Sequence, residues 1–387
     1  FYGPGIKGNG NDNALVTQVH TLTVVNTSDS EFADIVVREQ DDIAIAANYH
    51  PQGGLYTQAG KIDVQLASQD ARLFHRSGVI TTGQSDQDIT IVADDVDFWA
   101  GEGSVSATGQ FWLQSQTPEQ VYKIGQAAQS VYGDDYSNRG PDGSIDFSMQ
   151  DMAALADGFE RLQFGTADTA VTMYVGSLKE QLFEGYLKFE VDGDGAPIRN
   201  MFGELQTYTE DTTLNAALKD DALFLAQRIN VVGNVYGEGE IRMAADLIEI
   251  NRQNAKDPMG EPDSGVEAQT TYFEVGEQMI VSGWAKGRDL LDIRVTNTDG
   301  QDTMLTDPLG PNSLTADMGS VVASLNDGSQ VYIETVGSVR IATMLEAQGT
   351  DSQVHVRAGT GFSLLEGGLV AVREDGAGIT LHSGDFM

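Results

Sequence analysis

Five oxygen-bearing side chains lie close together in one turn-rich segment of the sequence. They are Asp134, Asp135, Asn138, Asp142 and Asp146. Carboxylate and amide oxygens are the ligands that Ca²⁺ prefers, and a loop can wrap them around the ion. The spacing lacks the twelve-residue order of an EF-hand, and aspartate is also favoured in polar turns. The segment is therefore a candidate Ca²⁺ site, with an ordinary polar turn as the alternative.

A second acidic group, formed by Asp94, Asp95 and Asp97, offers carboxylates for catalysis. An inverting glycosidase places two carboxyl groups around a sugar and a water molecule. Alternate residues of a strand share a face, so Asp95 and Asp97 point outward if Val96 and Phe98 point into a core. No cluster of histidine or arginine near them in the sequence completes a catalytic site. We therefore expect no enzyme activity and no catalytic residues, and we keep a polysaccharide lyase or glycoside hydrolase as the alternative.

The other reactive residue types form no recognised motif. The chain has no cysteine, which excludes disulfides and thiolate metal sites. Its five histidines show no H-E-x-x-H spacing, and neither a G-x-S-x-G elbow nor a Walker-type phosphate loop is present. The three tryptophans could stack on sugars, but core packing is the simpler assignment. No cofactor is therefore expected to be required, and Ca²⁺ is the one ion that the sequence suggests.

The charge balance excludes several partners. With 22 basic and 58 acidic residues, the net charge is -36. Such a field repels nucleic acids and anionic membranes. No stretch contains the roughly 18 apolar residues that a membrane span needs. The first residues show neither an initiator methionine nor a signal peptide, so we interpret the chain as a processed piece or an excerpt of a larger protein.

Short runs of alternating apolar and polar residues, separated by Gly, Asp, Asn or Ser, indicate the fold. Such runs occupy residues 61–66, 71–75, 88–92, 95–99, 104–106 and 110–114. Strand-turn-strand units that return about every 20 residues are typical of a solenoid, in which each turn stacks on the one before. We therefore predict an all-β parallel β-solenoid with loop insertions and one or two short helices.

An internal repeat near the C-terminus gives the solenoid a period. SQVYI at 329–333 returns as SQVHV at 352–356, and Val339 and Ile341 fall opposite Phe362 and Leu364 in the same frame. Coils of about 22 residues, spaced about 4.8 Å apart, predict roughly 17 coils and a rod on the order of 80 Å long.

Three segments interrupt the strand pattern. The Gly- and Asp-rich stretch 126–146 is predicted to be an insertion, and Ser148 after it begins a capping-box pattern for about two helical turns that Gly158 would close. Residues 215–228 fit either a helix or strands at 222–225 and 229–232. Residues 251–265 contain two prolines and no apolar periodicity, which predicts a loop or boundary. The predicted organisation is thus a β-solenoid over 1–250, a boundary at 251–265, and a continuation or second β-rich domain over 266–387.

Two longer phrases carry a family resemblance. Residues 105–118 (VSATGQFWLQSQTP), which lead to YKIG at 122–125, and residues 155–168 (LADGFERLQFGTAD) resemble repeats of giant bacterial surface proteins related to filamentous haemagglutinin. Gln163 and Phe164 depart from the family phrase, which has a small polar and an aliphatic residue there. The resemblance extends over residues 13–250, and over 266–387 it is limited to the general character of the sequence.

The resemblance implies a right-handed parallel β-helix that is secreted or displayed on the cell surface, without catalytic residues. The function predicted from it is adhesion, or an extracellular structural fibre. Expected partners are neighbouring repeats of a longer chain, other copies of the chain, and surface glycans or proteins of a host or the environment. A Ca²⁺-stabilised self-assembling surface layer or filament is a further alternative.

Overall fold

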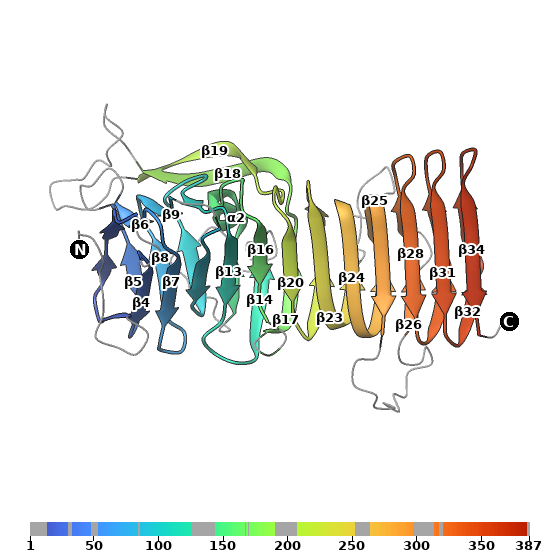
Figure 1. Ribbon diagram of the computed structural model, residues 1–387, viewed down its shortest axis with the longest axis horizontal. Helices are drawn as coiled ribbons and strands as arrows, with labels where there is room; N and C mark the ends of the chain where they lie inside the picture. Colours follow the sequence, from blue (N-terminus) through green and yellow to red (C-terminus); the bar gives the residue numbers. More distant parts are fainter. Residues whose placement is uncertain are drawn as a thin grey trace.

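Parallel β-sheets account for nearly all of the regular structure, as the alternating runs predict. The computed structural model describes residues 14–29, 33–47, 53–83, 86–125, 144–166, 168, 170–189, 207–251, 264–296, 313–316 and 320–384. Within these residues the strands lie side by side along the longest axis of the molecule, from the N-terminal to the C-terminal end (Figure 1).

One continuous column of parallel strands runs the full length of the described chain. Its members, in order, are β1 (Leu15–Thr17), β4 (Ile35–Glu39), β7 (Ile62–Leu66), β10 (Ile89–Val92), β13 (Gln110–Gln114), β16 (Arg161–Phe164), β20 (Ala222–Leu225), β23 (Glu240–Ile250), β24 (Gly265–Val281), β25 (Trp284–Val295), β28 (Gln330–Thr335), β31 (Gln353–Ala358) and β34 (Gly378–Ser383). These thirteen strands give the described part of the chain thirteen levels, and we call each level a rung. The expectation of roughly 17 coils was wrong, because insertions between the strands take up part of the chain.

Other strands form parallel columns beside the first. In the N-terminal part, one column contains β2 (Thr21–Leu22), β5 (Ile43–Ile45), β8 (Arg72–His75) and β11 (Asp95–Phe98), and another contains β3 (Val24–Asn26), β6 (Gly54–Thr57), β9 (Val79–Thr82) and β12 (Val105–Ser106). Further along, the flanking strands are β14 (Gln120–Ile124), β15 (Ile145–Phe147), β17 (Ala170–Val175), β21 (Arg228–Val231), β22 (Asn234–Tyr236), β26 (Ser313–Ala316), β27 (Val321–Ser324), β29 (Ser338–Ile341), β30 (Met344–Ala347), β32 (Gly361–Leu364) and β33 (Leu369–Val372).

In the C-terminal part each strand pairs with the third strand before it. β31 pairs with β28, β32 with β29, and β33 with β30. The pairing aligns Val331 with Val354 and Val339 with Phe362. The 23-residue repeat seen in the sequence is therefore a repeat of neighbouring rungs, and its frame is confirmed.

The core is made of the alternate side chains that point to the inside of these columns. Inner residues at neighbouring levels of a parallel column pack above and below one another. Phe164 pairs with Phe224 of the next rung, and their rings stack at 5.4 Å between centroids. Phe111 packs against Phe164 with a tilted ring at 6.2 Å. All three are fully buried, so an aromatic segment fills the core at these rungs.

Many acidic side chains at the turns are bound to the neighbouring rung. Their carboxylates accept backbone N–H groups that the sheet leaves without a strand partner, which stabilises the turns. The pairs are Lys61 N to Asp34 at 3.0 Å, Gln110 N to Asp88 at 2.7 Å, Glu240 N to Asp221 at 2.7 Å and Thr350 N to Asp327 at 2.8 Å. Part of the acidic composition is thus explained by contacts between rungs.

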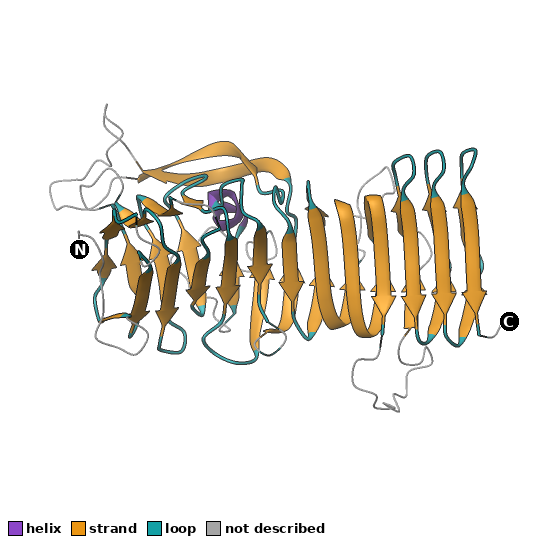
Figure 2. Ribbon diagram, viewed as in Figure 1, coloured by secondary structure: helices purple, strands orange, loops and turns teal. Residues whose placement is uncertain are grey.

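A short helix and a hairpin interrupt the columns. The helix α2 (Met149–Ala154) begins at the predicted cap, since Ser148 and Asp151 form a complete capping box. It ends at Leu155, not at Gly158 as expected, and spans six residues. An antiparallel pair, β18 (Glu180–Phe189) and β19 (Thr207–Asn215), lies above α2 in Figure 2. No described helix is long and apolar enough to cross a membrane.

Two uncertain segments of the sequence have different outcomes. Residues 222–225 and 228–231 are strands β20 and β21, so the helical alternative for residues 215–228 was wrong. The predicted boundary at 251–265 lies mostly outside the described residues. The strands on its two sides, β23 and β24, pair in parallel over almost their whole common length.

Candidate functional site

The strongest cluster of titratable groups lies on the outer face of β8 and β11. These strands pair so that Asp95 stands opposite Arg72 and Asp97 opposite Phe74. Val96 and Phe98 are fully buried in the core. The alternation therefore places both aspartates on the outer face of the sheet, as the sequence predicts.

Arg72 is the cation that joins the two aspartates. Its Nε and a terminal guanidinium nitrogen both donate to Asp97 Oδ2. Its Nε also lies 3.6 Å from Asp95 Oδ2. The Arg72 side chain is only 16 % exposed, so these ion pairs are screened much less than pairs at an open surface.

The helix α2 brings a third carboxylate to the same place. Asp151 Oδ1 accepts the backbone N–H of Phe98 on β11 at 2.6 Å. Its Oδ2 accepts the N–H of Ser148 at 2.7 Å and the hydroxyl of Ser148 at 2.6 Å. One side chain thus caps its own helix and fastens that helix to the sheet. Asp95 is only 7 % exposed, although it points outward from the core.

Aromatic rings and a second arginine border the cluster. The guanidinium groups of Arg72 and Arg76 lie 5.2 and 5.1 Å from the centroid of the Phe74 ring. Trp99 meets Phe74 edge to face at 4.5 Å. Cations over an aromatic face are attracted by the negative ring surface, so Phe74 helps to hold both arginines.

Burial raises the pKa values of all three carboxyl groups, and repulsion from neighbouring carboxylates adds to this effect at Asp95 and Asp151. Burial raises the pKa of Asp97 to about 6, although Arg72 acts in the opposite direction. Burial and then the charge of Asp97 raise the pKa of Asp151 to about 7, against the hydrogen bonds from Phe98 and Ser148. The pKa of Asp95 is also raised, first by burial and then by the charge of Asp97. The cluster therefore holds protons near neutral pH.

A carboxyl group that is protonated near neutral pH can act as a general acid. Here, however, both oxygens of Asp151 already bind groups of the protein, and Asp97 is bound by Arg72. These contacts favour a positioning role for the cluster, in which it joins β8, β11 and α2.

The third acidic residue singled out in the sequence, Asp94, has a separate structural role. It is 4 % exposed and accepts four hydrogen bonds. The donors are the N–H groups of Asp70 and Thr117, at 2.9 and 2.8 Å, and the hydroxyls of Ser115, at 3.0 Å, and Thr117. The structure thus brings Asp95 and Asp97 together and directs Asp94 to the turns on either side.

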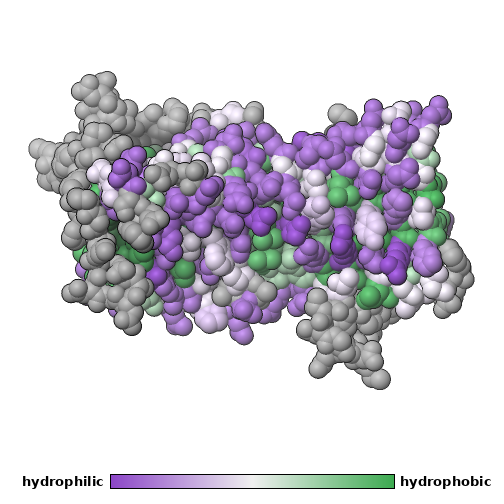
Figure 3. All heavy atoms as spheres, viewed as in Figure 1, coloured by the Kyte–Doolittle hydropathy of each residue, from purple (hydrophilic) through white to green (hydrophobic). Residues whose placement is uncertain are grey.

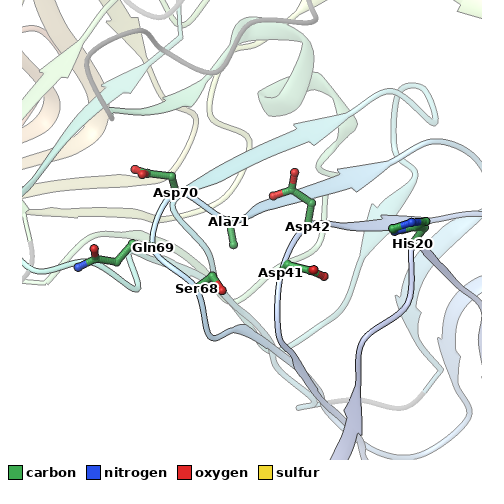
Figure 4. A pocket seen from close by; sticks show the side chains of 7 residues that line it. All are labelled: His20, Asp41, Asp42, Ser68, Gln69, Asp70 and Ala71. Atoms are coloured by element: carbon green, nitrogen blue, oxygen red, sulfur yellow. The ribbon is translucent and has the colours of Figure 1, made fainter.

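A cavity of about 350 Å³ lies at the neighbouring turns and is shown in Figure 4. Its walls come from three successive turns and include His20, Asp41, Asp42 and Asp70. Asp42 Oδ1 accepts the N–H of Arg72 at 3.0 Å, so this wall is also used to join two rungs. None of the three carboxylates with raised pKa values lines the cavity.

Most of the predicted Ca²⁺ ligands lie outside the described residues. This holds for Asp134, Asp135, Asn138 and Asp142. Asp146 is described on β15, where it accepts the hydroxyl of Ser144 at 3.0 Å and its charge contributes to the raised pKa of Asp95. Within the described ranges, no group of three or more histidine, aspartate or glutamate side chains could hold a metal ion. The Ca²⁺ site stays a prediction.

The sequence analysis missed two members of the cluster, Arg72 and Asp151. Arg72 lies 23 residues before Asp95, the same separation as in the C-terminal repeat, so applying that period to the N-terminal half would have paired them. The sequence analysis identified the capping-box pattern that begins at Ser148, and Asp151 is the acidic residue of that pattern. Because an insertion separates α2 from β11 in the sequence, their spacing did not predict that Asp151 contacts β11.

Comparison with protein families, curated proteins and solved structures finds no match to this chain. The resemblance to filamentous-haemagglutinin-like surface proteins therefore stays a prediction from the quoted phrases.

Proposed function

We propose that the chain is a right-handed parallel β-solenoid that serves as a non-catalytic segment of a large secreted or cell-surface protein. Its role is adhesion, or spanning a distance as an extracellular structural element. The observation that carries this proposal is the in-register column of thirteen parallel strands, with every third strand paired over much of the chain. Twelve steps of about 4.8 Å make this column about 60 Å long.

The chemistry of the described side chains supports a structural use of the acidic residues. Carboxylates at the turns accept N–H groups of the next rung, as Asp88 and Asp327 do. On the outer face, Glu334 pairs with Arg357 at 3.1 Å across two rungs. Such contacts make a stiff element with a solvated acidic surface, which fits a segment that presents a surface to host or environmental glycans or proteins.

The architecture is tested by disulfides between rungs, since the chain has no cysteine of its own. Paired cysteines at Tyr332 and His355, Arg340 and Ser363, or Glu346 and Ala371 replace direct neighbours in three columns. Neighbouring Cα atoms of paired strands are close enough for a disulfide. A set displaced by one residue is the control. Oxidation of the displaced set instead of the paired set would refute the solenoid.

The adhesion role is tested with the purified chain on arrays of glycans and of host and environmental surface proteins. Saturable binding that survives physiological salt supports adhesion, because non-specific attraction to an acidic protein is screened there. Binding to no surface component would leave only the structural role.

A second candidate, a polysaccharide-degrading enzyme, is favoured by one observation. Asp97 and Asp151 have pKa values of about 6 and 7, as a general acid requires, and the Phe74 ring beside Arg72 meets Trp99 edge to face. Incubation with acidic and neutral polysaccharides, followed by assay of new reducing ends and unsaturated products, separates the two candidates. Activity that Asp97→Asn and Asp151→Asn abolish would support the enzyme.

A Ca²⁺-stabilised layer or filament is the third candidate, and it depends on the segment that contains Asp134 and Asp135. Chelation with EDTA should then lower the melting temperature or dissociate the assembly, and added Ca²⁺ should restore it. Unchanged melting and assembly would eliminate this candidate.

A further inference from the structure

The outer face of the main strand column has an uncharged region in its middle. Over β10, β13, β16 and β20, one row of outward side chains is in register across four rungs, and a second row lies two residues further along the strands. We call the residues of these two rows the neutral strip, and they are Thr90, Val92, Trp112, Gln114, Gln163, Leu223 and Leu225. All of them are partly exposed. Figure 3 shows hydrophobic side chains among hydrophilic ones near the middle of the molecule, at the level of these rungs along the long axis.

Charged side chains surround the neutral strip. One rung before it, Asp63 is the register partner of Thr90, and one rung after it, Arg242 is the register partner of Leu223. Arg161, at the start of β16, borders the strip on one side. The strip is therefore an uncharged area within a charged surface, in a chain whose net charge is -36.

The polar groups of the strip have no partners within the described part of the chain. Elsewhere in the column, outward side chains bind each other across rungs, as Arg38 binds Asp63 at 3.0 Å. In contrast, the hydroxyl of Thr90 and the amides of Gln114 and Gln163 make no hydrogen bond to any described residue. Hydroxyl and amide groups both donate and accept hydrogen bonds. The strip thus offers free hydrogen-bonding groups without charge.

Trp112 and the leucines supply the apolar surface of the strip. The indole Nε1 of Trp112 is buried and has no acceptor among the described residues, although the residue itself is partly exposed. The ring therefore presents its carbon surface to the solvent. Leu223 lies two rungs further along the same row, and Gln163 lies between them. Apolar and amide groups thus alternate along this row.

We propose that the neutral strip binds an uncharged glycan that lies along the column, with one sugar ring against the indole of Trp112. A sugar ring has an apolar face of C–H groups and hydroxyl groups around its edge. It therefore fits an aromatic surface with uncharged donors and acceptors beside it. Trp112 provides the surface, and the amides of Gln114, on the same strand, and Gln163, on the next rung, bind the hydroxyls. This inference rests on the proposed adhesion and gives it a site.

The size and the charge of the strip favour an uncharged glycan over other partners. Three steps of about 4.8 Å make the strip about 14 Å long, and its two rows are about 7 Å apart. A stable protein interface needs about 800 Å² on each partner, which is far more than this area. The strip contains no cation for a carboxylate or sulfate group, and the charge of the chain repels anionic glycans.

Binding is tested with the purified chain and soluble oligosaccharides as probes. The neutral probes are fragments of β-glucan, α-glucan, mannan and chitin, and the acidic probes are fragments of polygalacturonate and alginate. Titration calorimetry should detect saturable binding of at least one neutral series. The affinity should be the same at low and at physiological salt, because no opposite charges meet in the complex.

Substitutions at Trp112 and a matched control locate the site. Trp112→Ala should weaken binding about tenfold or more, and Trp112→Phe, which keeps an aromatic ring, should weaken it less. The control Tyr174→Ala removes an exposed aromatic side chain from β17, outside the strip, and should leave the affinity unchanged. Circular dichroism and thermal melting verify that the variants are folded.

Tryptophan fluorescence reports the contact directly. The chain has three tryptophans, and Trp112 is the one that the proposal places under the sugar. A saturating concentration of the neutral probe should protect part of the fluorescence of the wild type from quenching by acrylamide. The same concentration should give no such protection in Trp112→Phe.

Three results would overturn the inference: no neutral probe binds, only acidic probes bind, or Trp112→Ala and Tyr174→Ala weaken binding equally. The last two results leave the proposed adhesion intact, because a glycan is then bound at another site. If no glycan binds, binding to surface proteins on the arrays decides separately whether the adhesion role holds. The disulfides between rungs test the solenoid independently of any ligand.

Discussion

The raised pKa of Asp151 predicts how the stability of the fold depends on pH. In the folded protein the pKa of Asp151 is about 7, against 3.8 in the unfolded chain. Between these values the folded state binds the proton and the unfolded state does not. This group therefore destabilises the fold at pH values above 7, and the penalty is relieved as the pH falls through 7. The substitution Asp151→Asn removes the penalty at every pH.

The size of the effect follows from proton linkage. Lowering the pH from 8 to 5 should stabilise the fold through Asp151 by about 2.6 kcal/mol. Asp97, with a pKa of about 6, adds at most about 1.4 kcal/mol over the same range. The two contributions are not independent, because the charge of Asp97 contributes to the raised pKa of Asp151.

His75 acts in the opposite direction and partly conceals this effect. Its imidazole is fully buried, and burial lowers its pKa to about 3 from 6.5. The unfolded state therefore binds the proton first, and stability is lost as the pH falls below 6.5. By pH 5 this loss is about 2 kcal/mol. The wild-type curve therefore shows only part of the change that the carboxyl groups produce, and the difference in stability between wild type and variant must be measured.

The assay is urea unfolding of wild type and Asp151→Asn at several pH values from 5 to 8. We expect the variant to gain stability relative to wild type by about 2 to 3 kcal/mol between pH 5 and pH 8. Ser148→Ala removes a hydrogen bond that lowers the pKa of Asp151, so its transition should move to higher pH. A difference that is independent of pH, or that has the opposite sign, would refute the reasoning.

Three further substitutions and one control test the packing, all by urea unfolding at pH 7. Asp94→Ala removes the acceptor of four buried or partly buried hydrogen bonds and should lower the free energy of unfolding by about 2 to 4 kcal/mol. The control Asp63→Ala, in a partly exposed ion pair, should lower it by less than about 1 kcal/mol. Equal losses of stability in the two variants would contradict the role of Asp94. Phe164→Ala should cost about 3 to 5 kcal/mol, and a loss below 1 kcal/mol would show that the aromatic column is not a packed core. Gly265→Ala places a Cβ 2.0 Å from Trp284 Cδ2 and should destabilise by about 1 to 3 kcal/mol; an unchanged midpoint would mean that the indole moves away freely.

The sequence predicted local elements well where alternation was strict. The predicted strands at 61–66, 88–92 and 110–114 correspond to β7, β10 and β13 within one residue. Alternation works here because an apolar side chain at every second position has one core to face. It did not single out the strands β9 and β14, where Thr81 and Lys123 occupy the middle of the run and neighbouring rungs supply the pairing.

The candidate site was predictable only in part. The outward direction of Asp95 and Asp97 follows from strand geometry alone. Their burial does not follow from the sequence, because it requires α2 to pack against β11. An insertion separates the two elements in the sequence, and its length does not reveal how close they lie in the fold. The raised pKa of Asp151 likewise depends on burial and on the charge of Asp97, a residue that is distant in the sequence.

By itself, the sequence determined the all-β character, the positions of most strands, the helix cap at Ser148 and the 23-residue repeat. Each of these depends on residues within one strand, one turn or one repeat. The tertiary structure alone decided that Arg72 meets Asp97 and that α2 brings Asp151 to the same cluster. These depend on which rungs become neighbours, and the pairing of strands distant in the chain is fixed only when the whole column has formed.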